Sequence, residues 1–196
     1  MNPEFIFYSL ITIIILNFLK DYYLSFLNSK NFDNKIPDEV SDVYDKEKYL
    51  KSQQYKKTQY SFSKLSRIFG LLIILSFFFL DGFYFLDELC KNLFDSPVLV
   101  SLCFLALIYV GNEVLSLPLS FYYTFVIEER FGFNKTTLKL FVLDKIKSWI
   151  LTLLLGGSVL SFLLYQYESL GNNFWITAWI FLTLVSILLN AFYSQL

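Results

Sequence analysis

Hydrophobic residues in this chain gather into five long blocks, and most charged residues lie between the blocks. Of the 196 residues, 56% are hydrophobic, whereas a soluble domain usually has about 45–50%. A helix that crosses the roughly 30 Å apolar core of a bilayer needs about 20 apolar residues, and the blocks approach or exceed that length. The blocks also lack the period-two alternation of membrane strands. The pattern predicts an all-α integral membrane protein with about five transmembrane helices, at residues 5–27, 68–86, 97–127, 149–167 and 174–193.

The third block is longer than a perpendicular crossing requires. Its 31 residues would extend for about 46 Å as a helix, at about 1.5 Å per residue. The helix must therefore tilt, leave the membrane or bend. Pro118 is a candidate position for a bend, because proline has no amide hydrogen to donate.

Basic residues are distributed unevenly between the loops. The loop over residues 28–67 and its flanks (Lys20 to Arg67) hold ten Lys or Arg, and residues 128–148 hold five. The loops on the other side hold only Lys91. The excess of basic residues in cytoplasmic loops predicts an N-terminus outside and a C-terminus in the cytoplasm. In the first of these loops, the acidic start at Pro37 predicts a helix from Asp38 to Lys64.

The sequence contains no histidine. This absence excludes HExxH zinc sites and Ser-His or Cys-His nucleophiles from the chain itself. Cys90 and Cys103 are thirteen positions apart, form no CxxC motif and are interpreted as small hydrophobic residues. We therefore expect no catalytic residue, no metal ligand and no bound cofactor in this chain. Nucleic acid is not an expected partner either, because the basic residues form loops rather than one basic face.

Asn112, Glu113 and Asp81 lie within or near apolar blocks. A charge at the centre of a bilayer costs about 2.5–3.5 kcal/mol on insertion scales. Asn112 and Glu113 are therefore candidates for lining a hydrated chamber, or else they lie near an interface because the helix is tilted. Asp81, which precedes Gly82, is expected at the outer interface.

The stretch after the third block carries a more specific pattern. Its residues predict a helix that leaves the membrane at Ile127, a turn, and a new helix capped by Thr136 or Thr137. The same stretch resembles the signature of the type I CAAX prenyl protease family. The matching positions are Pro118, Tyr122 or Tyr123, Phe125, Ile127, Glu128, Gly132, Phe133, Asn134, Thr137 and Asp144. Earlier residues match the family only in layout, with a short first span and a long cytoplasmic loop that contains Tyr55 and Phe62.

The resemblance implies an intramembrane zinc metalloendopeptidase with seven helices around a chamber. Zinc in that family is held by an HExxH motif and a downstream Glu, which we expect beyond Leu196. The chain would then be the N-terminal membrane region of the enzyme, inactive alone, with the lipid bilayer, the catalytic zinc domain and a protein or peptide substrate as partners. The substrate would carry a prenylated C-terminal CAAX sequence, from which the family removes the last three residues, or it would be another membrane-associated protein, as for bacterial members. The membrane would be the bacterial inner membrane, or the endoplasmic reticulum membrane in a eukaryote.

Within this reading, the turn is expected to dock the catalytic domain. Phe133 would otherwise expose a large ring, and Glu128 with Arg130 would form an ion pair or a docking contact. Two alternatives stay open. One is a non-catalytic membrane scaffold that kept the fold, and the other is an unrelated transporter subunit, which the lack of internal repeats disfavours.

Overall fold

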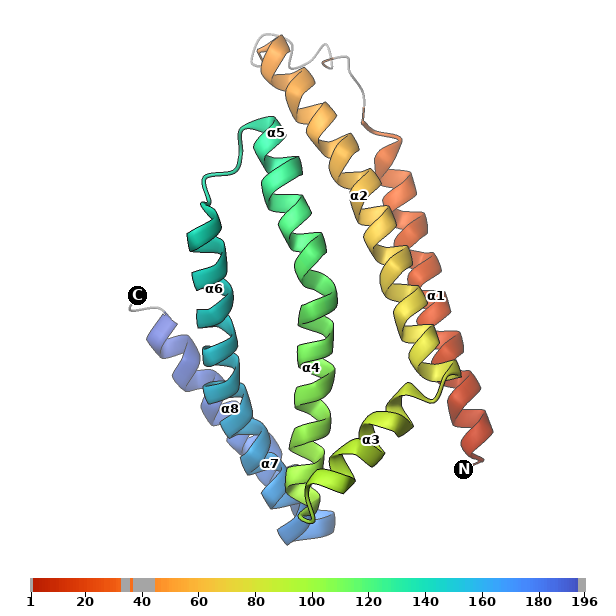
Figure 1. Cartoon of the computed structure of the whole chain (residues 1–196), viewed down its shortest axis with the longest axis vertical. Coiled ribbons are helices and arrows are strands. Elements are labelled where there is room, and N and C mark those ends of the chain that lie inside the picture. Colours follow the sequence, from red (N-terminus) through yellow and green to blue (C-terminus); the bar gives the residue numbers. More distant parts are fainter. Residues whose placement is uncertain (1, 33–35, 37–44, 194–196) are drawn as a thin grey trace. The chain divides into compact units, whose positions relative to one another are not determined.

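A computed structural model describes residues 2–32, 36 and 45–193, and all the described elements are helical (Figure 1). The chain divides into two compact units, Met1–Phe83 with Asn112–Thr136, and Tyr84–Gly111 with Thr137–Leu196. The all-α prediction is confirmed. The elements are α1 Pro3–Ser29, α2 Lys46–Phe79, α3 Gly82–Leu93, α4 Pro97–Tyr122, the π-helix η2 Tyr123–Glu128, α5 Glu129–Phe131, α6 Leu138–Leu151, the π-helix η3 Thr152–Gly156, α7 Gly157–Leu170, the 3₁₀ turn η4 Gly171–Asn173 and α8 Phe174–Tyr193.

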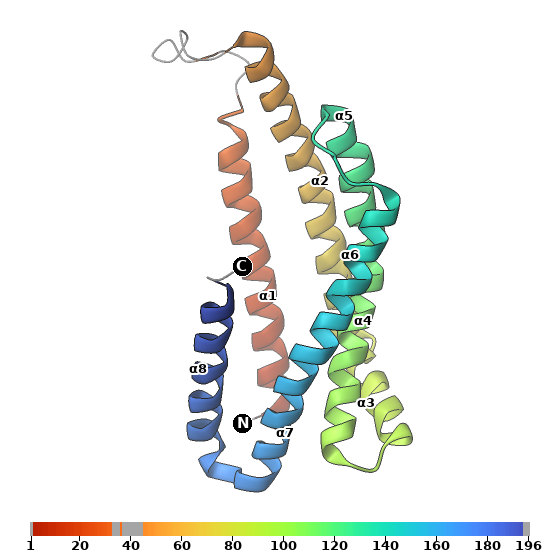
Figure 2. The same ribbon diagram turned by 90° about the vertical axis from the view of Figure 1, so that its left-hand side faces the viewer.

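Helices α1 and α2 form an antiparallel pair in the first unit, and both views in Figures 1 and 2 show them side by side. Phe7 near the start of α1 meets Phe78 near the end of α2, with ring centroids 5.8 Å apart. Each helix begins at a polar cap. The Asn2 side chain accepts a hydrogen bond from the Glu4 amide, and the Asp45 carboxylate accepts from two amides of the first turn of α2. These caps satisfy amides that have no partner within the helix.

The cytoplasmic helix predicted from Asp38 and the second apolar block are parts of one helix. The described part of α2 begins at Lys46 and continues without a break to Phe79. The predicted residues 38–44 lie outside the described part of the chain. One helix of 34 residues therefore carries both a charged half and an apolar half.

The predicted span at residues 68–86 is wrong as one continuous helix. Helix α2 ends at Phe79, and α3 starts at Gly82. Asp81 between them has φ 54°, a backbone conformation that few residues other than glycine adopt. A Cβ atom on Gly82 would lie 2.7 Å from Cδ1 of Phe77, so a larger residue here would force the Phe77 ring to move. The Asp-Gly pair that looked like a polar interruption is a helix break.

The helix of the third apolar block extends from Pro97 to Phe131. It therefore continues four residues beyond Ile127, where the sequence predicted that it leaves the membrane. Pro118 lies inside α4, and the widened π-helical turns of η2 begin five residues after it. Such π-helical segments are rare, and they are frequent at functional sites.

In the second unit, α6, η3 and α7 form one helical stretch that turns back at η4 (Figure 2). Phe162 of α7 and Phe181 of α8 pack with ring centroids 4.1 Å apart. Four helical stretches in the described residues are long and apolar enough to cross a membrane, and the last one, Leu138–Ala191, has 54 residues. A straight helix of that length would measure about 80 Å, whereas the η4 turn folds it into two crossings. The prediction of about five transmembrane helices is thus confirmed.

Few side chains in the described part of the chain are buried. Large apolar residues are instead exposed along the helices, as in Leu153 (72%), Trp179 (69%) and Trp175 (68%). Such a surface is unfavourable in water and favourable against lipid. The helices therefore depend on the bilayer to cover them.

Candidate functional site

Backbone hydrogen bonds close the turn that follows α5. Gly132 has φ 73° and ψ 24°, the left-handed conformation that glycine adopts at helix ends. The Glu128 carbonyl oxygen accepts hydrogen bonds from the amides of Phe133 (2.9 Å) and Asn134 (3.3 Å). The Gly132 amide donates to the Glu129 carbonyl at 3.0 Å. The carbonyl groups of Glu128 and Glu129 are therefore satisfied by the turn itself.

Asn134 fixes the chain on both sides of its own position. Its side-chain nitrogen donates to Oε2 of Glu129 at 2.9 Å, and its side-chain oxygen accepts from the Thr136 amide at 2.7 Å. Helix α6 then starts at Leu138, and its N-cap is Thr137, whose hydroxyl oxygen accepts from the Leu140 amide at 3.2 Å. Of the two predicted caps, Thr137 is the one that the structure contains.

The charged half of α2 packs on this turn through aromatic rings. The Tyr55 ring meets Phe131 edge to face at 5.3 Å and Phe133 at 4.9 Å between centroids. Phe131 is buried, with 5% of its surface exposed, whereas Phe133 keeps 51% exposed. The Lys51 ammonium lies 5.8 Å from the Phe133 ring centroid, at cation–π distance. The exposed half of the Phe133 ring is accordingly the part that no described residue covers.

A polar contact lies next to these rings. The hydroxyl oxygens of Tyr55 and Tyr123 are 2.8 Å apart, and Nε2 of Gln59 donates to the Tyr123 hydroxyl at 2.9 Å. The hydrogen bond with Tyr123, together with partial burial, raises the pKa of Tyr55 to about 12. Phe62 completes the cluster by stacking on Tyr122 at 5.6 Å and lying against Tyr123 at 5.7 Å. We call this set of residues the α2–α5 contact. It comprises Lys51, Tyr55, Gln59 and Phe62 of α2, Tyr122 of α4, Tyr123 of η2, Phe131 of α5 and Phe133 of the turn.

The chemistry of the α2–α5 contact is structural. Tyr55 is neutral at physiological pH, because its raised pKa lies far above that range, so it offers no anionic base. The described residues contain no group of three His, Cys, Asp or Glu that could hold a metal ion. Zinc, which the family resemblance implies, therefore does not fit the residues present here.

The other predicted residues occupy separate positions. Phe125 of η2 packs on Phe121 of α4, with ring centroids 4.8 Å apart. No ion pair joins Glu128 to Arg130 among the described residues; the Arg130 guanidinium instead lies 5.8 Å from the Phe131 ring centroid. Asp144 is exposed on α6, in the second unit. Asn112 is exposed and Glu113 half-buried, both within α4.

Sequence reasoning missed the partner of the turn. It noted Tyr55 and Phe62 only as part of the layout, and it did not single out Lys51, Gln59 or Phe131. The spacing of residues 51, 55, 59 and 62 at three or four positions places them on one helix face. From that spacing, the sequence could have predicted a packing face on this helix.

A family model described as CAAX prenyl protease N-terminal, five membrane helices, matches residues 25–196. The chain belongs to the CAAX prenyl protease N-terminal family. This membership confirms the resemblance drawn from the turn motif. The match includes both sides of the α2–α5 contact.

Several CAAX prenyl proteases are similar to the chain. The CAAX prenyl protease 1 homolog of Dictyostelium discoideum is 32% identical, over 91% of this chain and 43% of the relative. CAAX prenyl protease 1 of Saccharomyces cerevisiae is 32% identical, over 89% of this chain and 41% of the relative. The human homolog is 35% identical, over 82% and 35%. The chain thus spans less than half the length of these relatives.

The crystal structure of S. mikatae Ste24p has a similar fold, with a TM-score of 0.85 and 34% sequence identity. The likeness covers 91% of this chain and 43% of that chain. Together with the family match, it shows that the chain is a multi-pass integral membrane protein of this family.

Proposed function

We propose that this chain is the membrane-embedded N-terminal region of a zinc metalloendopeptidase that processes proteins with a C-terminal CAAX sequence. The observation that carries the proposal is the family match over residues 25–196, together with the names of the relatives. The scaffold alternative keeps the same fold and differs only in whether a catalytic segment acts with it.

The zinc and the hydrolytic chemistry belong, in this proposal, to a separate segment. The sequence has no histidine, and zinc sites of hydrolytic enzymes use imidazole and carboxylate ligands. The present chain would supply helices that line the intramembrane chamber and a turn that docks the catalytic segment. Asn112 and Glu113 on α4 are the proposed lining residues.

The docking surface in this proposal is the exposed half of Phe133, together with the exposed Arg130 three residues earlier in the chain. The α2–α5 contact holds the other side of the ring, so the turn presents the same surface before and after docking. Pre-organisation of this kind lowers the entropic cost of association. Charge distribution supports a cytoplasmic location for the turn, with the N-terminus outside and the C-terminus inside. The relatives named above are eukaryotic, which favours the endoplasmic reticulum membrane over a bacterial inner membrane.

The test is co-expression of this chain with the HExxH-bearing segment of the S. cerevisiae relative, followed by co-purification and assay on a prenylated CAAX peptide. We expect a stable complex that cleaves the peptide, and neither part should cleave it alone. A complex without cleavage, made with a segment known to be active in its own full-length enzyme, would favour the scaffold alternative.

A further inference from the structure

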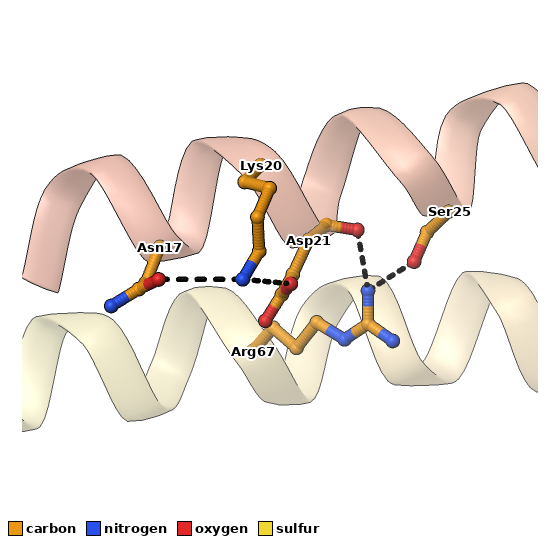
Figure 3. A network of polar contacts seen from close by, with 5 residues as sticks. All are labelled: Asn17, Lys20, Asp21, Ser25 and Arg67. Carbon is orange, nitrogen blue, oxygen red and sulfur yellow. Dashed lines mark hydrogen bonds and ion pairs between the residues drawn. The ribbon is translucent and has the colours of Figure 1, made fainter.

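The α1–α2 pair carries a second polar cluster, formed by Asn17, Lys20, Asp21 and Ser25 of α1 with Arg67 of α2 (Figure 3). Nη1 of Arg67 donates to the backbone carbonyl oxygen of Asp21 at 3.2 Å and to the hydroxyl of Ser25. Both acceptors are neutral. The hydrogen bonds fix the position of the guanidinium group but leave its positive charge uncompensated.

Two lysines lie near this arginine. Nζ of Lys20 is 3.5 Å from the Asp21 carboxylate and 3.3 Å from the side-chain oxygen of Asn17. Nζ of Lys64, one turn before Arg67 on α2, lies 5.5 Å from the centroid of the Tyr22 ring. No described carboxylate forms an ion pair with Lys64 or Arg67. Three cations and one carboxylate therefore leave this cluster with a net charge of about +2.

The cluster lies where the apolar half of α2 begins. Ile68 opens the apolar block of α2, and on α1 the side chains of Leu16 (59%) and Ile13 (53%), one and two turns before Lys20 on the same helix face, are exposed. In an integral membrane protein these exposed residues contact acyl chains, and cations beside them lie at the depth of the lipid phosphates. The position thus combines an apolar surface with an unpaired cationic group at one border.

We propose that Lys20, Lys64 and Arg67 bind the phosphate group of an anionic phospholipid, with the Tyr22 ring beside it. The pre-positioned guanidinium and the lysine ammonium groups supply charge-assisted donors, which phosphate oxygens accept well. The apolar surface below the cations accommodates the acyl chains of the same molecule. A second copy of this chain would bring the same positive charges and be repelled. The ligand is therefore a lipid with a net negative headgroup, such as phosphatidylserine.

The test uses native mass spectrometry of the full chain in detergent, titrated with phosphatidylserine or with phosphatidylcholine of the same acyl chains. Attraction of a basic group to an anionic lipid surface amounts to a factor of about five per residue. We expect the wild-type chain to bind the first phosphatidylserine at least about tenfold more tightly than phosphatidylcholine, and we expect the double variant K64Q/R67Q to lose this preference. The ratio of the affinity for phosphatidylserine to that for phosphatidylcholine is measured within each variant, so a general loss of stability does not alter it.

A matched control is K48Q/K56Q, which removes the same charge from exposed positions of the same helix. Lys56 lies twelve residues before Ile68, about 18 Å along the helix. This control should keep the preference. If K64Q/R67Q fails to insert, K64Q alone, which removes a group whose described partner is the Tyr22 side chain, should reduce the preference by several fold. Inorganic phosphate at millimolar concentration should not displace the lipid.

Three results would overturn the proposal: equal binding of the two lipids by the wild-type chain, equal losses in K64Q/R67Q and K48Q/K56Q, or full displacement by inorganic phosphate. The second would indicate diffuse attraction, and the third a site for free anions. None of these outcomes bears on the catalytic role proposed above.

Discussion

The phenol oxygens of Tyr55 and Tyr123 lie 2.8 Å apart, although the two residues are 68 positions apart in the chain. This hydrogen bond joins α2 to the π-helical segment that leads into the turn. Gln59 donates to the same Tyr123 oxygen, so Tyr123 is the centre of the contact and Tyr55 is at its edge.

This arrangement predicts unequal effects for two similar substitutions. Tyr55→Phe removes one hydrogen bond and should cost about 0.5–1.5 kcal/mol of unfolding free energy. Tyr123→Phe deprives both Tyr55 and Gln59 of a partner and should cost about 1–3 kcal/mol. Denaturation of the purified chain in detergent measures both values. Tyr23→Phe, at an exposed position on α1, is the control and should have little effect. Equal losses at positions 55 and 123 would contradict the central role of Tyr123.

The same pair predicts how stability depends on pH. The pKa of Tyr55 is raised from 10.0 to about 12, so the folded state favours the neutral phenol. Its contribution is fully present below about pH 10 and is lost as the pH rises through about 12. Ultraviolet titration of tyrosinate, compared between wild type and Tyr55→Phe, should show one late-titrating phenol that disappears in the variant.

Gly132 is predicted to be sensitive for a backbone reason alone. Its φ of 73° should make Gly132→Ala cost about 1–2 kcal/mol. Space does not add to this cost, because the nearest atom to an added Cβ is Nζ of Lys51 at 3.7 Å. Gly132→Asn should cost less, since asparagine tolerates this conformation. Gly70→Ala is the control, as its helical site has nothing within 4 Å, and it should be neutral or slightly stabilising.

Phe133→Ala is predicted to act on association more than on folding. The ring is half exposed and contacts Tyr55 and Lys51, so the isolated chain should lose no more than about 1 kcal/mol of stability. Co-purification with the catalytic segment should weaken at least about tenfold, since aromatic anchors commonly contribute more than 1.4 kcal/mol to binding. Phe5→Ala, at a 65% exposed ring on α1, is the control. Unchanged association would remove the docking role from this turn.

Orientation is testable with single cysteines in a chain that lacks Cys90 and Cys103. The distribution of basic residues predicts that an impermeant maleimide labels Asp95→Cys in intact bacterial cells expressing the chain. Lys135→Cys should be labelled only after the membrane is opened. The reverse pattern would place the N-terminus in the cytoplasm.

The fold followed from sequence largely because bilayer thickness dictates where apolar blocks must be helical. The break at Asp81 was harder to predict, since a single Asp-Gly pair also occurs as a polar interruption within a span. The turn at Gly132 was predictable from the sequence, because glycine and asparagine favour the left-handed backbone conformation that such a turn needs. Its partner Tyr55 was not, because a contact across 68 positions depends on how two helices pack, and neither helix encodes that alone.

The continuity of α2 has a mechanical consequence. Its 34 residues measure about 51 Å, of which the 22 residues up to Arg67 measure about 33 Å. With Arg67 at the lipid phosphates, that length projects beyond the apolar layer, and Tyr55 contacts the turn from within it. Because α2 has no break between Lys46 and Phe79, we expect a shift of the Gly132 turn to change the tilt of the whole helix, including the part that packs on α1.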